Sequence, residues 1–261
     1  MTTSFSTLLQ KCGAKSGHMT LEVPDDWMQG RSVFGGLQAA LALQTMDSLA
    51  PGRSLRCLQT NFVGPLSGHV RGEAKLLRSG KNAIQVEAKL YANDTLATQC
   101  LAIFGSSLES QVKVTPEQKT LESTSSQNFP YTPGVSPSFK QHFAMRLAEG
   151  HMPFAGKETL STAYELDLLD EGPTSKLHVA ALADVVPPLG LSFLSAPTFG
   201  STMSWMLEFV AEPAPDLSLK GWRLDSELVS AEGGYTHQTN VLWSPEGQAL
   251  ALSRQCMLVF G

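Results

Sequence analysis

The chain contains nearly the same short phrase twice, and this repeat limits the folds that it can adopt. The phrase "TQCLAIFG" covers residues 98–105, and "RQCMLVFG" covers residues 254–261. In each, a Gln (Gln99 or Gln255) is followed by Cys, an apolar run, Phe and Gly. A repeat over so long an interval indicates two copies of one structural unit, each ending in the same strand. The match carries no chemistry by itself, because a repeated core strand is enough to explain it.

A segment of different composition separates the two copies. Residues 109–140 are rich in Ser, Thr, Pro and Gln and show little periodicity. Such a segment cannot bury enough apolar surface to act as core, so it is predicted to be a linker. We therefore expect an N-terminal unit at 1–108, a linker at 109–143 and a C-terminal unit at 144–261.

Each copy has the pattern of one apolar helix followed by about four antiparallel strands. In the first copy, the signals predict a helix from about Gly36 to Ser48, which begins after a Gly pair and stops at Pro-Gly. In the second, residues 174–188 have a Thr/Ser start and a Pro-Pro stop. Residues 83–92 alternate cleanly between apolar and polar, as a strand with one buried face does. A helix that is apolar on most sides and precedes a meander favours an α+β fold in which the sheet curls around the helix.

The composition narrows the class of function. Hydrophobic residues make up 42% of the chain and charged residues 16%, a balance typical of a globular protein. A net charge of −5 without a basic cluster argues against nucleic acid as a partner. No apolar run is long enough to predict a membrane span, and the N-terminus lacks the pattern of a secretory signal. Four cysteines without C-x-x-C spacing indicate reduced thiols, so a cytoplasmic location is expected.

Several motifs, in the same order in both halves, resemble those of double-hotdog acyl-CoA thioesterases, and the type II group most of all. The first half contains "VFGGLQAAL", "PGRSLRCLQTNFVGPLSG" and "LLRSGKN", and the second contains "LADVVPP", "TMSWMLEF", "ELVSAEGG" and "SPEGQALALSRQ". The resemblance implies two tandem hotdog units, each a long helix wrapped by an antiparallel sheet. It also implies hydrolysis of fatty or related acyl-CoA thioesters to free acid and CoA by an activated water. No cofactor or metal is implied, and a homodimer is an open expectation.

The resemblance also implies a set of catalytic residues. In this family a carboxylate, a Ser or Thr and a Gln of the second unit activate the attacking water. The Gln falls on Gln255, and the hydroxyl falls on Ser230 to within one residue. The position of the carboxylate falls on Ser204, so the usual catalytic Asp is expected to be replaced by Ser. General-base assistance contributes about 100- to 10,000-fold to a rate, so its loss matters.

Two other functions stay open on this pattern. A non-catalytic acyl or acyl-CoA binding protein is favoured by Ser204 and opposed by Ser230 and Gln255. A hydratase or dehydratase acting on enoyl-CoA ranks last, because its Asp and His are not found together near the start of either helix.

Three residues near the helices are candidates for substrate binding. Asp184 aligns with an Asp on the family's second helix, and an acid in so apolar a helix usually has a specific partner. Alternatively, it bonds to backbone at the helix end or orders the Pro-Pro turn. The first amides of a helix that begins at Gly35 and Gly36 can point at a carbonyl or a phosphate. Alternatively, these glycines only let the helix start close to the sheet.

Overall fold

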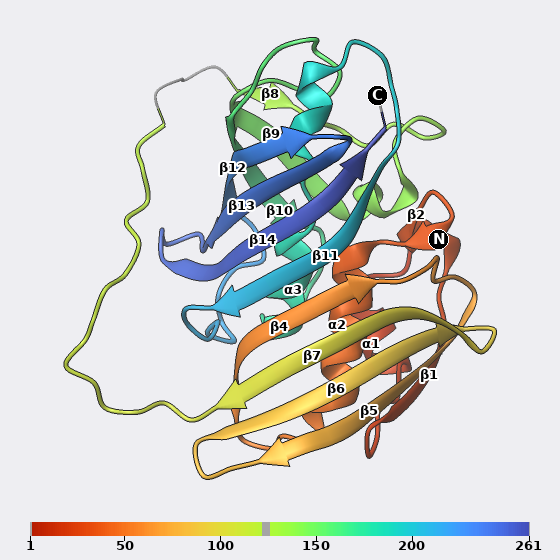
Figure 1. Ribbon diagram of the computed structural model, residues 1–261, viewed down its shortest axis with the longest axis vertical. Helices are drawn as coiled ribbons and strands as arrows, with labels where there is room; N and C mark the ends of the chain where they lie inside the picture. The colour runs from red at the N-terminus through yellow and green to blue at the C-terminus, as the bar shows by residue number, and fades with distance from the viewer. Residues whose placement is uncertain (1, 122–125, 261) are drawn as a thin grey trace.

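The computed structural model describes residues 2–121 and 126–260. Residues 122–125 of the predicted linker, and residues 1 and 261 at the ends of the predicted units, lie outside the described residues. The described chain forms a 12-stranded sheet that curves around the helices (Figure 1). No helix in the described part of the chain is long and apolar enough to cross a membrane.

The elements of the first half are α1 (Phe5–Lys11), β1 (His18–Glu22), the 3₁₀ helix η1 (Asp25–Trp27), the short strands β2 (Met28–Gln29) and β3 (Ser32–Val33), α2 (Gly35–Asp47), β4 (Ser54–Phe62), β5 (His69–Ser79), β6 (Ala83–Ala92) and β7 (Thr95–Gly105). The elements that follow are β8 (Gln127–Asn128), the 3₁₀ helix η2 (Ser138–His142), β9 (Phe143–Glu149), β10 (Ser161–Leu168), α3 (Lys176–Ala183), the 3₁₀ helix η3 (Leu189–Phe193), β11 (Gly200–Phe209), β12 (Trp222–Glu232), β13 (Tyr235–Trp243) and β14 (Ala249–Val259).

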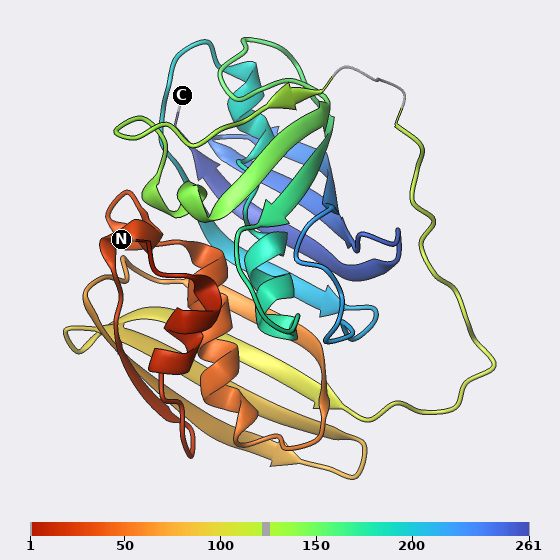
Figure 2. The same cartoon turned by 180° about the vertical axis from the view of Figure 1, so that it is seen from behind.

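Helix α2 is the central helix of the first half, and it begins and ends within one residue of the prediction. Its residues from Gly35 to Leu43 are all buried, which confirms the expectation drawn from its apolar sequence. The sheet covers α2 on one side, and α1 and α3 lie beside it on the concave face (Figure 2). Burial of this kind, rather than intrinsic helix propensity, provides most of the stability of such a helix.

The two halves join through antiparallel pairing of β4 with β11 at the middle of the sheet. On one side the order continues β7, β6, β5, β1, and on the other β14, β13, β12, β10, β9, β8. Each half therefore has its helix followed by four antiparallel strands, as the sequence predicted. Only the last three form a meander, because the first strand, β4 or β11, pairs with the fourth, β7 or β14. Helices α2 and α3 pack against each other beneath the central strands (Figure 2).

The repeated phrase does form the last strand of each half, β7 and β14, but the two copies face opposite ways. Gln99 is half-buried on the outer face and donates through Nε2 to Glu87 Oε1 at 2.7 Å. Gln255 is buried on the inner face. Because side chains alternate along a strand, a shift of one residue in the local register inverts the facing. The two glutamines are therefore equivalent in sequence and not in structure.

The structure also contains elements that the sequence pattern did not reveal. Helix α1 and strand β1 precede α2, and strands β9 and β10 precede α3. The three strands extend both ends of the sheet. The end of the predicted linker carries β8 and η2, and its Phe139 stacks on Phe34 with ring centroids 4.2 Å apart. This part of the segment therefore belongs to the core, although it is rich in Ser and Pro.

Candidate active site

The candidate site forms where the end of α3 meets the beginning of α2. Helix α3 starts with a capping box between Ser175 and His178, and Asp184 is its C-cap, shortly before Pro187 and Pro188. The Asp184 carboxylate accepts a hydrogen bond from the backbone N–H of Gly36. It thus satisfies one of the amides at the start of α2, where Phe34 provides no side-chain cap.

The two glycines at the start of α2 make this approach of the carboxylate possible. A Cβ on Gly35 would lie 2.6 Å from Asp184 Oδ2, and a Cβ on Gly36 would lie 2.9 Å from the Ala181 backbone. No side chain fits at either position without a shift of the neighbouring atoms. The glycines therefore allow close packing, and that packing brings the carboxylate to the helix amides. That these amides point at a carbonyl or a phosphate of a substrate stays a prediction.

Gln255 completes the immediate surroundings of Asp184. Its Nε2 donates to Asp184 Oδ1 at 2.7 Å. Its Oε1 accepts from Gln238 Nε2 at 3.2 Å and from Asn240 Nδ2 at 3.4 Å. Gln255 therefore presents an N–H donor to the carboxylate while its carbonyl faces the interior.

Burial governs the proton affinity of Asp184. Loss of solvent raises the pKa of this carboxyl to about 7, although hydrogen bonds from the Gly36 amide and Gln255 act to lower it. The residue as a whole is only half-buried, so part of its surface stays exposed to solvent. A carboxylate that exchanges its proton near neutral pH has the property required of a general base.

The structure brings four of the six predicted site residues together and leaves two apart. Asp184, Gln255, Gly35 and Gly36 are the four in contact. Ser204 and Ser230 lie in one row across the outer face of the sheet, since Ser204 pairs with Cys256, Cys256 with His237, and His237 with Ser230. Gln255 occupies the neighbouring row and points to the other face.

The resemblance to the family assigned these two hydroxyls to the site, but the strand pairing is irregular beside both of them. The pairing of β11 with β14 shifts between Thr202 and Ser204, and that of β12 with β13 shifts between Leu228 and Ser230. Each shift adds one residue to its strand. In β12 the extra residue turns Ser230 outward although it follows the inward position of Leu228 by two, and in β11 it turns Thr202 inward while Ser204 stays on the outer face. Thr202, opposite the buried Met257, is the inward-facing hydroxyl of β11 that the sequence interpretation missed.

The sequence interpretation also missed the polar residues behind Gln255. Gln238, Asn240 and Ser253 are all buried and hydrogen-bonded to one another or to Gln255. A signal for them exists, because Gln238 and Asn240 occupy alternate positions in the strand segment "THQTNVLW". Polar residues that share the inner face of a strand need partners within the core.

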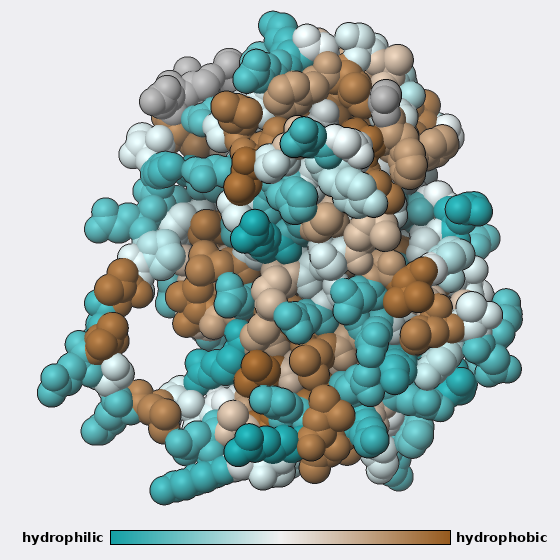
Figure 3. All heavy atoms as spheres, in the orientation of Figure 1, coloured by the Kyte–Doolittle hydropathy of each residue, from teal (hydrophilic) through white to brown (hydrophobic). Residues whose placement is uncertain are grey.

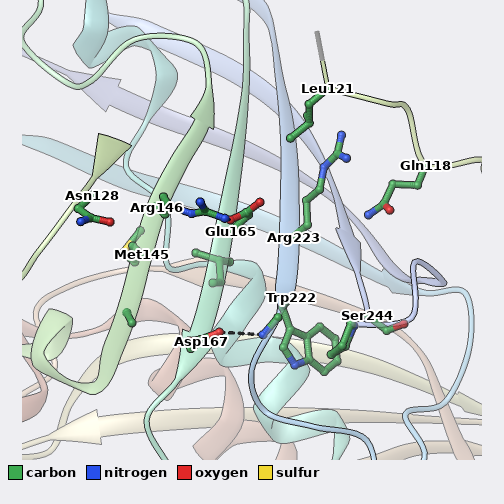
Figure 4. Close-up of a pocket in the computed structure, with 14 residues that line it drawn as sticks. Gln118, Leu121, Asn128, Met145, Arg146, Glu165, Asp167, Trp222, Arg223 and Ser244 are labelled. Atoms are coloured by element: carbon green, nitrogen blue, oxygen red, sulfur yellow. Dashed lines mark hydrogen bonds and ion pairs between the residues drawn. The ribbon is translucent and has the colours of Figure 1, made fainter. Parts of the chain in front are cut away.

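A separate hollow of about 650 Å³ lies on the outer face of β9, β10 and β12, beside the linker (Figure 4). Its charged side chains are already paired: Arg146 with Glu165, and Arg223 with Asp225. Asp167 accepts from the Gly221 backbone N–H at 2.7 Å. This hollow is therefore a less suitable place for the chemistry than the junction of α2 and α3.

Comparison with known families now identifies the class of protein. The chain belongs to the acyl-CoA thioesterase family, since the model of that family's N-terminal domain matches residues 23–105 and the model of its C-terminal domain matches residues 116–259. The molecule is thus a hotdog-fold protein of the thioesterase class. Among curated proteins, none matches the chain.

Solved structures share the fold over almost the whole chain. A hotdog-fold protein of unknown function from Alicyclobacillus acidocaldarius has a TM-score of 0.84 at 19% identity and covers 97% of this chain and 98% of its own. A putative thioesterase II from Thermobifida fusca has a TM-score of 0.82 at 15% identity, with 99% and 98% covered. The tesB protein of Mycobacterium avium subs paratuberculosis has a TM-score of 0.79 at 14% identity, with 99% and 100% covered. These similarities confirm the α+β double-hotdog fold.

Proposed function

We propose that the protein hydrolyses acyl-CoA thioesters to a free acid and CoA, with Asp184 as general base. The observation that carries the proposal is the position of the Asp184 carboxylate. It lies between the first amides of α2 and the Gln255 donor, and burial raises its pKa to about 7. The carboxylate that the family resemblance requires is therefore offered by the end of α3, and not by the strand that carries Ser204.

The reaction follows from this geometry. Asp184 removes a proton from a water molecule, whose oxygen forms a bond to the thioester carbonyl carbon. The C–S bond then breaks, and the proton held by Asp184 passes to the departing CoA thiolate. Gln255 holds Oδ1 of the carboxylate, which leaves Oδ2 on the side of Gly35 to face the water. The partial positive charge at the start of α2 favours the negative charge that develops on the carbonyl oxygen.

A hydroxyl on the inner face completes the proposed set. Thr202 lies opposite Met257, two positions along β14 from Gln255. We assign to it the task of orienting the water, in place of Ser204 and Ser230.

This site is evidence against both alternative functions. The argument for a non-catalytic acyl-CoA binding protein came from Ser204, and Asp184 supplies the carboxylate that Ser204 lacks. A hydratase requires a His beside its Asp, whereas the hydrogen-bond donors that act on Asp184 are Gly36 and Gln255. Hydrolysis is therefore the function that this arrangement supports best.

The test is thiol release from acyl-CoAs of short to long chain length, measured for the wild type, Asp184→Asn and Ser204→Ala. Asp184→Asn should lower kcat/KM by about 100- to 10,000-fold, as expected for loss of a general base. Ser204→Ala, an outer-face control on the same sheet, should retain the activity. Turnover that is unaffected by Asp184→Asn would contradict the assignment of the base. Binding of acyl-CoA without turnover on any chain length would favour the binding protein.

A further inference from the structure

We propose that Gln238 and Asn240 are positioning residues that fix the direction of the Gln255 amide, so that its N–H and not its carbonyl faces Asp184. The inference rests on the proposed function, because it concerns the same carboxylate. It concerns residues that touch neither the carboxylate nor the predicted position of the water.

The direction is set first at the backbone of η3. The N–H of Leu189 donates to Gln238 Oε1 at 3.1 Å. A backbone N–H can only donate, so Gln238 must turn its carbonyl oxygen toward Leu189 and its Nε2 toward the opposite side. The reversed amide would place one N–H group against another.

The same constraint passes from Gln238 to Gln255. Gln238 Nε2 donates to Gln255 Oε1 at 3.2 Å and to Asn240 Oδ1 at 3.1 Å. Asn240 Nδ2 donates to Gln255 Oε1 at 3.4 Å and to Ser253 Oγ at 2.8 Å. Two donors therefore point at Gln255 Oε1, and a reversed Gln255 would bring its own N–H groups against both of them.

Burial makes this direction difficult to reverse. Gln238 is 0% exposed, Asn240 3% and Gln255 5%, so no bulk water is available to replace a lost partner. Buried amides without partners are strongly disfavoured, and a fully bonded network holds its members in one arrangement. Among the described residues, the network reaches Asp184 through Gln255 Nε2.

The direction of this amide matters because it decides which form of Asp184 is favoured. A donor on Oδ1 stabilises the ionised carboxylate, which is the form that accepts a proton from water. A reversed Gln255 would point its carbonyl at the carboxylate and favour the protonated acid. The other groups that act on Asp184 are the Gly36 N–H and the surrounding apolar atoms, and neither carries a formal charge.

The network also links the base to its own chain segment. Leu189 follows Asp184 by five residues, across the Pro187–Pro188 turn. The segment that carries the base thus also supplies the N–H that sets the direction of the amides.

The first experiment measures the titration of Asp184 directly by ¹³C NMR on protein labelled at Asp carboxyl carbons, with the signal assigned by its loss in Asp184→Asn. The variant is Gln238→Met combined with Asn240→Leu, which removes both donors to Gln255 Oε1. Its Asp184 midpoint should rise by about one pH unit, in line with the loss of a hydrogen bond to the charged form. Gln99→Met, which removes the outer-face amide of β7, should leave the midpoint unchanged.

A second measurement needs no variant in the network. In the wild type, the Gln255 side-chain NH₂ signals, assigned by Gln255→Ala, should shift with the same midpoint as Asp184. Gln255 NH₂ signals whose chemical shifts do not change as Asp184 titrates would overturn the proposal. An unchanged Asp184 midpoint in the folded double variant would overturn it as well. Neither readout depends on turnover, so absence of thioesterase activity would contradict the proposed function without affecting this result.

In the active enzyme, the rising limb of the kcat against pH profile should move upward with the Asp184 midpoint in the double variant, while KM changes little. A fall in activity with no shift of the profile would mean that Gln238 and Asn240 act only through stability, and would contradict the positioning role.

Discussion

Asp184 is the residue on which the proposed chemistry depends, and the sequence revealed only part of its role. Its position in an apolar helix indicated that it needs a specific partner. The partner could not be predicted, because Gln255 lies 71 residues away and meets it only in the folded chain. Ser204 shows the opposite case: its strand was recognised, but its side chain lies on the outer face, opposite to that of the buried Trp205.

The raised pKa of Asp184 predicts a dependence of stability on pH. The folded state holds this proton up to about pH 7, whereas the ordinary pKa of an exposed Asp is 3.8. Between these pH values the folded protein thus binds more protons than the unfolded chain. The contribution of Asp184 to the free energy of unfolding therefore falls as pH rises through 7. Asp184→Asn removes this dependence. The Tm of Asp184→Asn minus that of the wild type should therefore increase between about pH 4 and about pH 8. These values lie roughly at the pKa of Asp184 in the unfolded chain and just above its pKa in the folded state.

Thermal unfolding at a series of pH values measures this difference. A Tm difference between the two proteins that stays constant across the series would mean that Asp184 titrates alike in the folded and unfolded states.

At the scale of elements, long apolar segments were predictable and short ones were not. Helix α2 was located within one residue because its Ala/Leu-rich sequence has no Gly or Pro between the Gly pair at its start and the Pro-Gly stop after it. Helix α1 has only seven residues, and a helix of that length depends on tertiary partners. One such partner is Asp170, which accepts the Ser6 N–H at 2.7 Å from 164 residues away.

The start of α2 provides a prediction at this scale. Gly35→Ala should lower kcat/KM by about 100-fold, because a new Cβ 2.6 Å from Asp184 Oδ2 must displace the carboxylate, and a displacement of about 1 Å can have this effect. Steady-state thiol release measures it. The matched control is Gly64→Ala, where a Cβ would meet only ordinary contact with the Leu96 oxygen at 3.7 Å.

Full activity in Gly35→Ala would show that the carboxylate has room to move without loss of function. It would thus contradict the close contact on which the site is built. Equal losses in both glycine variants would indicate a general effect on the fold.

At the scale of the molecule, duplication produces two helix junctions that differ in chemistry. The start of α2 meets the end of α3 at Asp184, and the start of α3 meets the end of α2 at Asp47. There, Lys176 Nζ pairs with Asp47 Oδ1 at 2.6 Å and lies 5.6 Å from the centre of the Phe104 ring. A lysine therefore occupies the second junction, whereas the first leaves a carboxylate oxygen available for a water.

The sequence was sufficient for the fold class, because the repeat and two buried helices leave few other arrangements. It was insufficient for the site, because the β-bulges and the amide network exist only once strands are paired. The unit boundaries at 1–108, 109–143 and 144–261 and the homodimer stay predictions. On the face shown in Figure 3, polar and apolar side chains are interspersed over much of the sheet.

The most direct test of the central claim is the pH dependence of kcat/KM for acyl-CoA hydrolysis by the wild type. If Asp184 is the general base, the activity should be low when this carboxyl is protonated. It should then rise with pH through a midpoint near 7, the pKa to which burial raises it. A profile that is already flat well below pH 7 would contradict the account, because the base would then have to be a carboxylate with an ordinary pKa.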